Sequence, residues 1–517
     1  MAETNKICAV IELGSNSIFF KIAQKRGADI DVLENIEYNL SLGKDSFAKG
    51  KIEFEKVVKT CELIEDFLEM AKGYRVRVKD IKMVATTAVR EAKNREYIID
   101  QIMVRTGLQL QVLDDSEEKL FMYREILRQI KDIEELKNET ILISYIGSGS
   151  LGIALYKNGS IIFAQNILIG TLKLSEILGT LKYRTDKLYV VIDEYMTTFT
   201  KMLEKILPVN EINTFVVSGS GIKFLRAQCK FKKSGSLYDI GIPEFMGIYN
   251  IIKDKNPEQI EKIYSMSEER AEILLPSMGI YKSLIGLTNA KEMISPSGDL
   301  LDAIVYSILF ENEKGEIDKI VEESTILTAK NIAERYFYDK EHADFVEENS
   351  LKIFDKMKKF HGMGDRERLY LRIAAILHDI GKYMNIKNHY KHSYNIINAA
   401  DILGLNERET SIVANIARYH SRELPSEDNR GYRILSNEDK VLVSKLTAII
   451  RLADALDRSH AQKVQGVDIN FKGNELTVTV SGMEAILIDE WTFIKKSSFM
   501  QEVFGVKTII KKRGREL

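Results

Sequence analysis

The sequence has few cysteines, few prolines and no long apolar run. Its 517 residues include three cysteines, far apart and without a C-x-x-C pair, which excludes a disulfide framework and predicts buried thiols in a reducing compartment: Cys8, Cys61 and Cys229. No apolar segment approaches the roughly 18 residues of a membrane-spanning helix, and the N-terminus lacks the pattern of a signal peptide. With only six prolines there is no proline-rich linker. We therefore expect a cytoplasmic protein, without a membrane partner, whose domains join through helices or short loops.

Charge of either sign is not in excess. Lysine and arginine number 74 against 76 aspartates and glutamates, so the net charge of −2 does not indicate bulk nucleic-acid binding. An apolar content of 45% and a charged content of 29% are typical of soluble globular proteins. The length predicts roughly three to four domains.

All seven histidines lie at or after position 342, and several of them form an ordered series with two aspartates. His342, His420 and Asp454 each lie in their own amphipathic segment, and the apolar spacing of LYLRIAAILHDIG predicts a buried helix with the adjacent pair His378-Asp379 at its inner end. Imidazole and carboxylate are ligands of divalent metals, so a helical bundle would bring a metal site together. The alternative is that these are ordinary core or surface side chains. The series is His342, His378, Asp379, His392, His420 and Asp454.

Two hairpins with small polar turns lie in the first third of the chain. Residues 7–24 read as a strand, a turn and a second strand, and residues 140–156 repeat this layout. Two such turns facing each other present backbone N–H groups to a phosphate. The turn residues are Gly14, Ser15, Asn16 and Ser17 in the first hairpin, and Gly147, Ser148, Gly149 and Ser150 in the second.

Four segments together resemble the exopolyphosphatase/guanosine-pentaphosphate phosphohydrolase (Ppx/GppA) family of the actin-like ATPase superfamily. They are AVIELGSNS, VATTAVREAKN, VLDDSEEKLFMY and SGSGIKFL, similar to that family's A-V-I-D-L-G-S-N-S, V-A-T-x-A-x-R-x-A-x-N, I-S-G-x-E-E-A-R-L and G-T-G-G-T. The histidine series is similar to the HD phosphohydrolase pattern, and its additional histidines resemble those of two-metal HD-GYP members. The resemblance covers essentially the whole chain.

The resemblance implies two actin-like (ribonuclease-H-like) α/β lobes around a cleft, followed by an all-α HD-type domain and a small α+β tail. The expected boundaries are residues 1–130, 131–312, 313–460 and 461–517. The tail, VDINFKGNELTVTVSG, alternates apolar and polar residues around Gly473-Asn474, a hairpin signal. The resemblance also implies a homodimer. A cleft between two lobes predicts closure by rotation about a hinge near residues 125–135.

Carried over by residue, the resemblance implies a phosphate cradle made of the two turns. Arg90 would contact a phosphate, and Glu117 or Glu118 would be the base, with the local register leaving the choice open. Glu12 would hold Mg²⁺ in the cleft, while the HD ligands are compatible with a pair of Mn, Fe, Ni or Zn ions. Lys382 is either a contact to substrate phosphate or a helix-end cation.

Three positions depart from the family pattern. Glu12 stands where the family has Asp, and Tyr145 and Gly152 replace both acidic residues of its D-I-G-G-G-S-x-E segment. Losing a metal carboxylate removes charge stabilisation on which phosphoryl transfer depends.

We expect an exopolyphosphatase-type hydrolase that uses divalent metal to release terminal phosphate from inorganic polyphosphate or guanosine pentaphosphate. One alternative places the chemistry in a two-metal HD domain beside a degenerate cleft. The other is a non-catalytic sensor of polyphosphate or an alarmone, a reading that Tyr145 and Gly152 favour.

Overall fold

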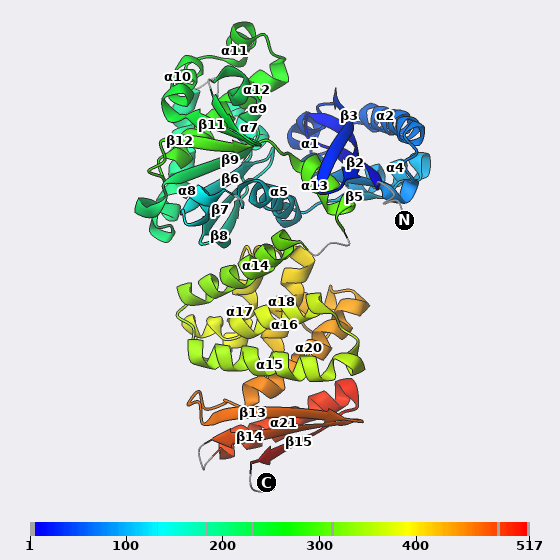
Figure 1. The fold of residues 1–517 in the computed structure, drawn as a ribbon, viewed down its shortest axis with the longest axis vertical. Coiled ribbons are helices and arrows are strands. Elements are labelled where there is room, and N and C mark those ends of the chain that lie inside the picture. Colours follow the sequence, from blue (N-terminus) through cyan, green and yellow to red (C-terminus); the bar gives the residue numbers. More distant parts are fainter. Residues whose placement is uncertain are drawn as a thin grey trace. The chain divides into compact units, whose positions relative to one another are not determined.

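The computed structural model describes residues 6–131, 133–181, 185, 187–229, 231–311, 315–482 and 486–513. The chain forms two compact units that divide after Ser324. Figure 1 shows strands and helices alternating in the first unit, and helices followed by a small sheet in the second. None of the described helices is both long and apolar enough to cross a bilayer.

The first unit contains two mixed sheets with the same internal order of strands. One has the order β3-β2-β1-β4-β5, and the other, β10-β11-β12-β9-β6-β7-β8, contains the equivalent series β8-β7-β6-β9-β12. In both, a three-stranded antiparallel meander is extended by parallel strands. The duplication indicated by the two hairpins is therefore present at the level of whole sheets. The strands are β1 (Ile7–Leu13), β2 (Ser17–Arg26), β3 (Asp29–Asn39), β4 (Ile81–Ala85), β5 (Leu110–Val112), β6 (Ile141–Ile146), β7 (Leu151–Lys157), β8 (Ser160–Ile167), β9 (Thr214–Gly219), β10 (Phe231–Ser234), β11 (Leu237–Gly241) and β12 (Glu292–Pro296).

Helices cover the faces of these sheets. The central strands β1 and β6 are almost continuously apolar because both of their faces are buried. Helix α13 follows the second sheet in sequence but packs on β1 and α5 of the first. The helices are α1 (Leu42–Lys49), α2 (Phe54–Gly73), η1 (Val78–Asp80), α3 (Thr87–Arg90), α4 (Arg95–Thr106), α5 (Asp115–Ile130), α6 (Glu134–Lys137), α7 (Thr171–Leu181), α8 (Leu188–Ile206), η2 (Val209–Glu211), α9 (Ile222–Gln228), α10 (Ile242–Ile252), α11 (Pro257–Tyr264), α12 (Glu268–Ile285) and α13 (Leu300–Leu309).

The second unit is a helical bundle followed by a three-stranded sheet. Helix α16 ends at Leu377, so His378 and Asp379 follow directly at its buried end, as its apolar spacing predicts. A hairpin turns at Gly473, whose φ of +60° suits glycine, and β15 joins β14 in parallel. The elements are α14 (Glu316–Arg335), which contains the division between the units, α15 (Lys340–His361), α16 (Asp365–Leu377), η3 (Ile380–Tyr383), α17 (His389–Asn398), α18 (Glu407–Tyr419), α19 (Arg430–Arg433), α20 (Asn437–Ala455), β13 (Val464–Lys472), β14 (Glu475–Gly482), α21 (Leu487–Phe504) and β15 (Lys507–Lys512).

The predicted fold class is confirmed: two mixed α/β sheets precede a helical domain and a small sheet. The four predicted domain boundaries stay a prediction. The predicted hinge lies partly within α5 and includes residue 132, which is outside the described residues.

Candidate functional site

The two glycine-serine turns of the first unit meet each other. Ser15 Oγ lies 2.7 Å from Ser148 Oγ, and each turn is closed by a backbone hydrogen bond, from Gly14 N to Ser17 O and from Gly147 N to Ser150 O. Both turns line a cavity of about 220 Å³. The turns that the sequence predicts to act together are therefore brought together.

Several backbone amides of these turns remain available. Among the described residues, the N–H groups of Ser15, Asn16, Ser148 and Gly149 donate no hydrogen bond to the protein. Gly149 packs against Thr87 so closely that a Cβ at this position would lie 2.1 Å from the threonine Cγ2. Small residues here let two sets of unpaired N–H groups approach each other, an arrangement suited to an anion.

The structure gives the two candidate bases different surroundings. Glu117 completes a capping box at the start of α5, where its carboxylate accepts a hydrogen bond from Asp114 N at 3.0 Å. Glu118 is buried and lines the cavity. Its Oε1 accepts a hydrogen bond from the Tyr145 hydroxyl at 3.1 Å, and its Oε2 accepts one from Arg90 at 3.3 Å. Glu118 is thus the carboxylate that faces the cavity, but both of its oxygens are engaged.

Arg90 is held by the protein. Besides Glu118, it donates hydrogen bonds to Asp115 Oδ1 at 2.7 Å, to the carbonyl of Leu113 at 2.7 Å and to Thr87 Oγ1 at 3.0 Å. It is not among the residues that line the cavity. In this structure its guanidinium fixes the start of α5.

The position of Tyr145 offers no metal carboxylate. Its buried phenol donates to Glu118, and burial together with Glu118 raises the pKa of Tyr145 well above its usual value. Burial and the neighbouring carboxylates Asp299 and Glu118 also raise the pKa of Glu12 to about 8. With no cation bound, both groups are therefore protonated at pH 7.

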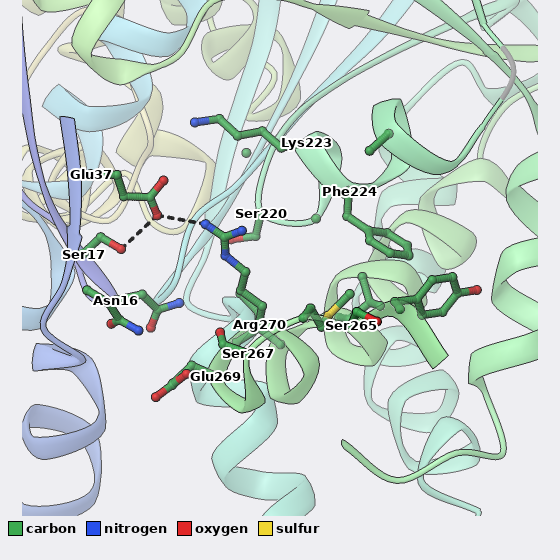
Figure 2. Close-up of a pocket in the computed structure, with 18 of the residues that line it drawn as sticks. Asn16, Ser17, Glu37, Ser220, Lys223, Phe224, Ser265, Ser267, Glu269 and Arg270 are labelled. Carbon is green, nitrogen blue, oxygen red and sulfur yellow. Dashed lines mark hydrogen bonds and ion pairs between the residues drawn. The ribbon is translucent and has the colours of Figure 1, made fainter. Parts of the chain in front are cut away.

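A larger pocket of about 750 Å³ adjoins the cavity, and Asn16, Ser17 and Lys223 line both. Figure 2 shows Glu37 of β3 between Ser17 and Arg270 of α12, with contacts of 3.0 and 3.3 Å. Phe224 and the region around Ser265 form another part of the wall. The pocket has the size of a small-ligand site and combines polar groups with an aromatic ring.

In the second unit, buried histidines converge on Asp379. Its Oδ1 lies 3.2 Å from His389 Nε2 and 3.4 Å from His420 Nε2. Its Oδ2 lies 3.5 Å from His378 Nε2 and 3.7 Å from His342 Nε2. The two oxygens of one carboxylate therefore face two different pairs of histidines.

Asp454 of α20 joins the pair formed by His342 and His378. Its Oδ1 lies 3.5 Å from His342 Nε2 and 3.7 Å from His378 Nε2. Ligands bound about 2.0–2.2 Å from one ion lie roughly 3–3.5 Å from each other. The spacings in both groups, 3.2 to 3.7 Å, are close to that range.

Each imidazole is oriented by its other nitrogen. His378 Nδ1 is 2.7 Å from the carbonyl of Ala375, and His420 Nδ1 is 2.6 Å from that of Ala417. His389 Nδ1 lies 3.0 Å from Ile386 O, and His342 Nδ1 lies 2.9 Å from Asp457 Oδ2. An N–H donated outward leaves the Nε2 lone pair directed at the centre, as in metal-ligating histidines.

The protonation states follow from burial and charge. Burial lowers the pKa of His378 to about 3 and also lowers that of His420, so both imidazoles are neutral at pH 7. Burial opposes ionisation of Asp379 as well, but the adjacent histidines hold its pKa well below the usual range. Hydrogen bonds to Asp454 and Asp457 outweigh burial and raise the pKa of His342 to about 9. With no cation bound, His342 is therefore protonated at pH 7, whereas His378 and His420 are neutral and face ionised carboxylates.

His392 lies apart from this cluster, and His389 lies in it. His389 is the first residue of α17 and also approaches His420, with 3.3 Å between the two Nε2 atoms. His392 is half-buried one turn further along, with its Cβ against Gly381, and its ring joins none of the hydrogen bonds or ion pairs among the described residues. The two histidines are three residues apart, so the sequence alone offers no way to choose between them.

Further charged groups surround the centre, and of these the sequence analysis named only Lys382. Lys496 of α21 pairs with Asp454 and donates a hydrogen bond to the carbonyl of His420 at 3.0 Å. Lys382 lies 2.5 Å from Asp379 Oδ2 and 2.9 Å from His460 Nε2. The side chains of Lys382 and His460 are 32% and 22% exposed, so they mark the side of the centre that is open to solvent.

The donor set fits divalent metal. His378 Nε2 faces His342 Nε2 at 3.2 Å, which is a contact between ring nitrogens whose outer N–H groups are already used. Three groups of ligand atoms, each within 4.8 Å of one another, contain His342, His378 and Asp454, then His342, Asp379 and His460, then His378, Asp379 and His420. Imidazole and carboxylate without thiolate match Mn, Fe, Ni or Zn.

Two family models match this chain. The model of the Ppx/GppA phosphatase family matches residues 21–311, and that of Ppx/GppA phosphatase domain III matches residues 325–495. The chain belongs to the Ppx/GppA phosphatase family.

Relatives of this Ppx/GppA chain are distant. A guanosine-5'-triphosphate,3'-diphosphate pyrophosphatase of Pseudoalteromonas translucida is 21% identical over 453 residues, 86% of each chain. One of Photobacterium profundum is 19% identical over 493 residues, 91% of each chain. Among solved structures, an Aquifex aeolicus family member (TM-score 0.50, 19% identity) covers 60% of this chain and 100% of its own. An exopolyphosphatase of Cytophaga hutchinsonii (TM-score 0.51, 18% identity) covers 59% and 98%. These structural likenesses establish the fold.

Proposed function

We propose that this Ppx/GppA protein is a metal-dependent phosphohydrolase whose chemistry takes place at the histidine-aspartate centre of the helical unit. The proposed substrates are inorganic polyphosphate or guanosine pentaphosphate, from which terminal phosphate is released. The observation that supports it is the convergence of four histidine Nε2 atoms on the two oxygens of Asp379. We further propose that the α/β cleft binds the phosphate chain and contributes little catalysis.

The geometry supports a ligand assignment. We propose that His342, His378 and Asp454 would hold one ion and that His389 and His420 would hold another, with Asp379 within reach of both groups. Metal held by these residues would supply water of lowered pKa and positive charge for a phosphoryl group.

The remaining residues act on the ligands and on the substrate. The carbonyls of Ala375 and Ala417 hold the histidine tautomers, and Asp457 orients His342. On the solvent-facing side, we propose that Lys382 binds a substrate phosphate by its ammonium charge. His460, stacked on His342 with ring centroids 3.6 Å apart, is positioned to exchange a proton with the leaving group.

The test of this assignment compares two neighbouring histidines. We expect His389→Ala to lose about half of the bound metal and to release phosphate about 10²-fold or more slowly, because one ion loses a ligand. His392→Ala is the matched control and is expected to keep both metal and rate. Metal content by mass spectrometry and Mn²⁺-dependent phosphate release from tripolyphosphate measure the two effects. Loss of metal in His392→Ala with full occupancy in His389→Ala would overturn the assignment.

A second candidate function is hydrolysis in the α/β cleft itself. It is favoured by one observation, the buried carboxylate of Glu118 on the wall of a cavity that also carries both turns. The hydrogen bonds from Tyr145 and Arg90 to Glu118 weigh against it, because a base with both oxygens engaged is weakened. The adjoining pocket of about 750 Å³ supports a nucleotide, such as guanosine pentaphosphate, as the cleft ligand.

Phosphate binding in the cleft is expected to weaken as Glu12 ionises. The pKa of this carboxyl is about 8, so it is neutral at pH 7 and carries a negative charge at pH 9. We expect wild-type affinity for tripolyphosphate to fall about tenfold between these pH values, from repulsion across a few ångströms of protein. Calorimetric titration of wild type and Glu12→Gln at both pH values separates this effect from titration of the ligand. An equal decrease in the two proteins would contradict the role of Glu12.

A further inference from the structure

Lys119 is a buried cation beneath the second glycine-serine turn. Its side chain, on α5, is 2% exposed, and its Nζ donates a hydrogen bond to Ser150 Oγ at 2.5 Å. The ammonium lies 5.1 Å from the centre of the Tyr145 ring. A Cβ placed on Gly147 would lie 3.8 Å from this Nζ, which shows how close the charge is to the turn.

Lys119 occupies space that Gly152 leaves open. A Cβ at position 152 would lie 2.9 Å from Lys119 Cδ and 2.7 Å from the hydroxyl of Tyr123. A side chain longer than that of glycine at position 152 would therefore clash with Lys119 in its present position. The family segment that residues 145–152 resemble ends in Glu, whereas position 152 here is Gly and the adjoining space holds the basic side chain of Lys119.

Beneath the second glycine-serine turn, two carboxylates and two basic side chains give a net charge of zero in the absence of a metal. Asp115 and Glu118 are the two carboxylates here, and Arg90 pairs with both, at 2.7 and 3.3 Å. Lys119 lies 3.8 Å from Asp115 and 4.0 Å from Glu118, and it supplies the second positive charge. Without it the group would carry a net negative charge, and in a buried setting that charge would repel an anion bound at the turn.

We propose that Lys119 replaces a divalent cation in the cleft, so that the two turns bind a phosphate chain without metal. This inference rests on the proposed role of the cleft as a phosphate site. The ammonium is fixed by Ser150, and Ser150 Oγ in turn donates to Asp115 Oδ1 at 2.7 Å. A charge held this way needs no reorganisation when the anion enters. The cleft of this chain is thus a metal-independent binding site for polyphosphate or a nucleoside polyphosphate.

The experiment is calorimetric titration of the full chain with tripolyphosphate, in EDTA and in Mg²⁺. All proteins carry Asp379→Asn, so that the helical unit contributes no metal-dependent binding. We expect affinity in EDTA to lie within about threefold of that in Mg²⁺. Lys119→Gln, which keeps a hydrogen-bond donor near Ser150 but removes the charge, is expected to weaken binding in EDTA at least about tenfold. Lys282→Met, which removes a lysine paired with Asp193 outside the cavity, is the control and is expected to bind normally.

A double variant keeps the inference testable if Lys119→Gln folds poorly. Lys119→Ala/Gly152→Glu places a carboxylate in the space of the lysine, and we expect its binding to require Mg²⁺, an effect that a structural role of Lys119 would not produce. Binding by the parent protein in Mg²⁺ but not in EDTA overturns the inference and leaves the cleft as a phosphate site. No binding under either condition overturns the proposed role of the cleft itself.

Discussion

Replacement of Asp379 by Asn is expected to reduce phosphate release by at least about 10³-fold. Asp379 faces His342 and His378 with one oxygen and His389 and His420 with the other. The amide is nearly isosteric but neutral, so both groups of ligands lose a shared negative charge while packing is kept. Initial rates with tripolyphosphate and with guanosine pentaphosphate, at saturating Mn²⁺, measure the effect.

The control for this substitution is Asp355→Asn. Asp355 is on α15 of the same unit and pairs with Arg368 at 2.8 Å, away from the centre. We expect this variant to retain the wild-type rate. If Asp379→Asn also retains it, the second candidate is correct, and the hydrolysis takes place in the α/β cleft with Glu118 as the next residue to replace.

Replacement of Gly381 by Ala is expected to disrupt the same centre, because the added methyl group would clash with the backbone of α17. A Cβ on Gly381 would lie 2.1 Å from the carbonyl oxygen of His389 and 2.4 Å from the amide nitrogen of Ser393. These are backbone atoms of α17 and cannot move as the end of a flexible side chain does. We expect the free energy of unfolding of the helical unit to fall by about 2–3 kcal/mol and the metal content to fall with it, because α17 must move away from Asp379. Chemical denaturation monitored through Trp491, in this unit, measures the loss.

Gly364→Ala is the matched control. At this position a Cβ approaches only the end of the Glu367 side chain, at 3.3 Å, and φ is −100°. We expect a change in unfolding free energy within about 0.5 kcal/mol. Equal stability and equal metal content in Gly381→Ala and wild type would show that α17 is not held against η3 as the structure describes.

Much of the fold could be predicted because its signals are local. The turn at Gly14–Ser17 between two apolar runs, its repetition at Gly147–Ser150 and the Gly473 turn all produce the predicted hairpins. The apolar spacing before His378 likewise predicts the helix that ends there. In each case the residues that specify the element lie within a few positions of one another, so periodicity and turn chemistry suffice.

The details of the candidate sites depend on contacts between distant segments. His389 rather than His392 reaches Asp379 because of where α17 begins and how closely it approaches Gly381. The roles of Glu117 and Glu118 can be distinguished only in the structure, where Glu117 forms the capping box with Asp114 at the start of α5.

Two buried lysines were also missed by the sequence analysis. Lys119 and Lys496 look like ordinary surface lysines in the sequence, and their burial follows from tertiary packing alone. Lys119 and Gly152 are 33 residues apart in the sequence but adjacent in the structure. A local sequence pattern cannot predict a contact of this kind.

The contact between the Ser15 and Ser148 hydroxyls has a kinetic consequence. The Ser15 and Ser148 hydroxyls are 2.7 Å apart, so the two turns already contact each other in the absence of a ligand. If the cleft binds a phosphate chain as proposed, this contact would have to separate before the chain could reach the unpaired amides. We therefore expect association and dissociation both to be slower than diffusion allows, because both would require the same separation of the two turns.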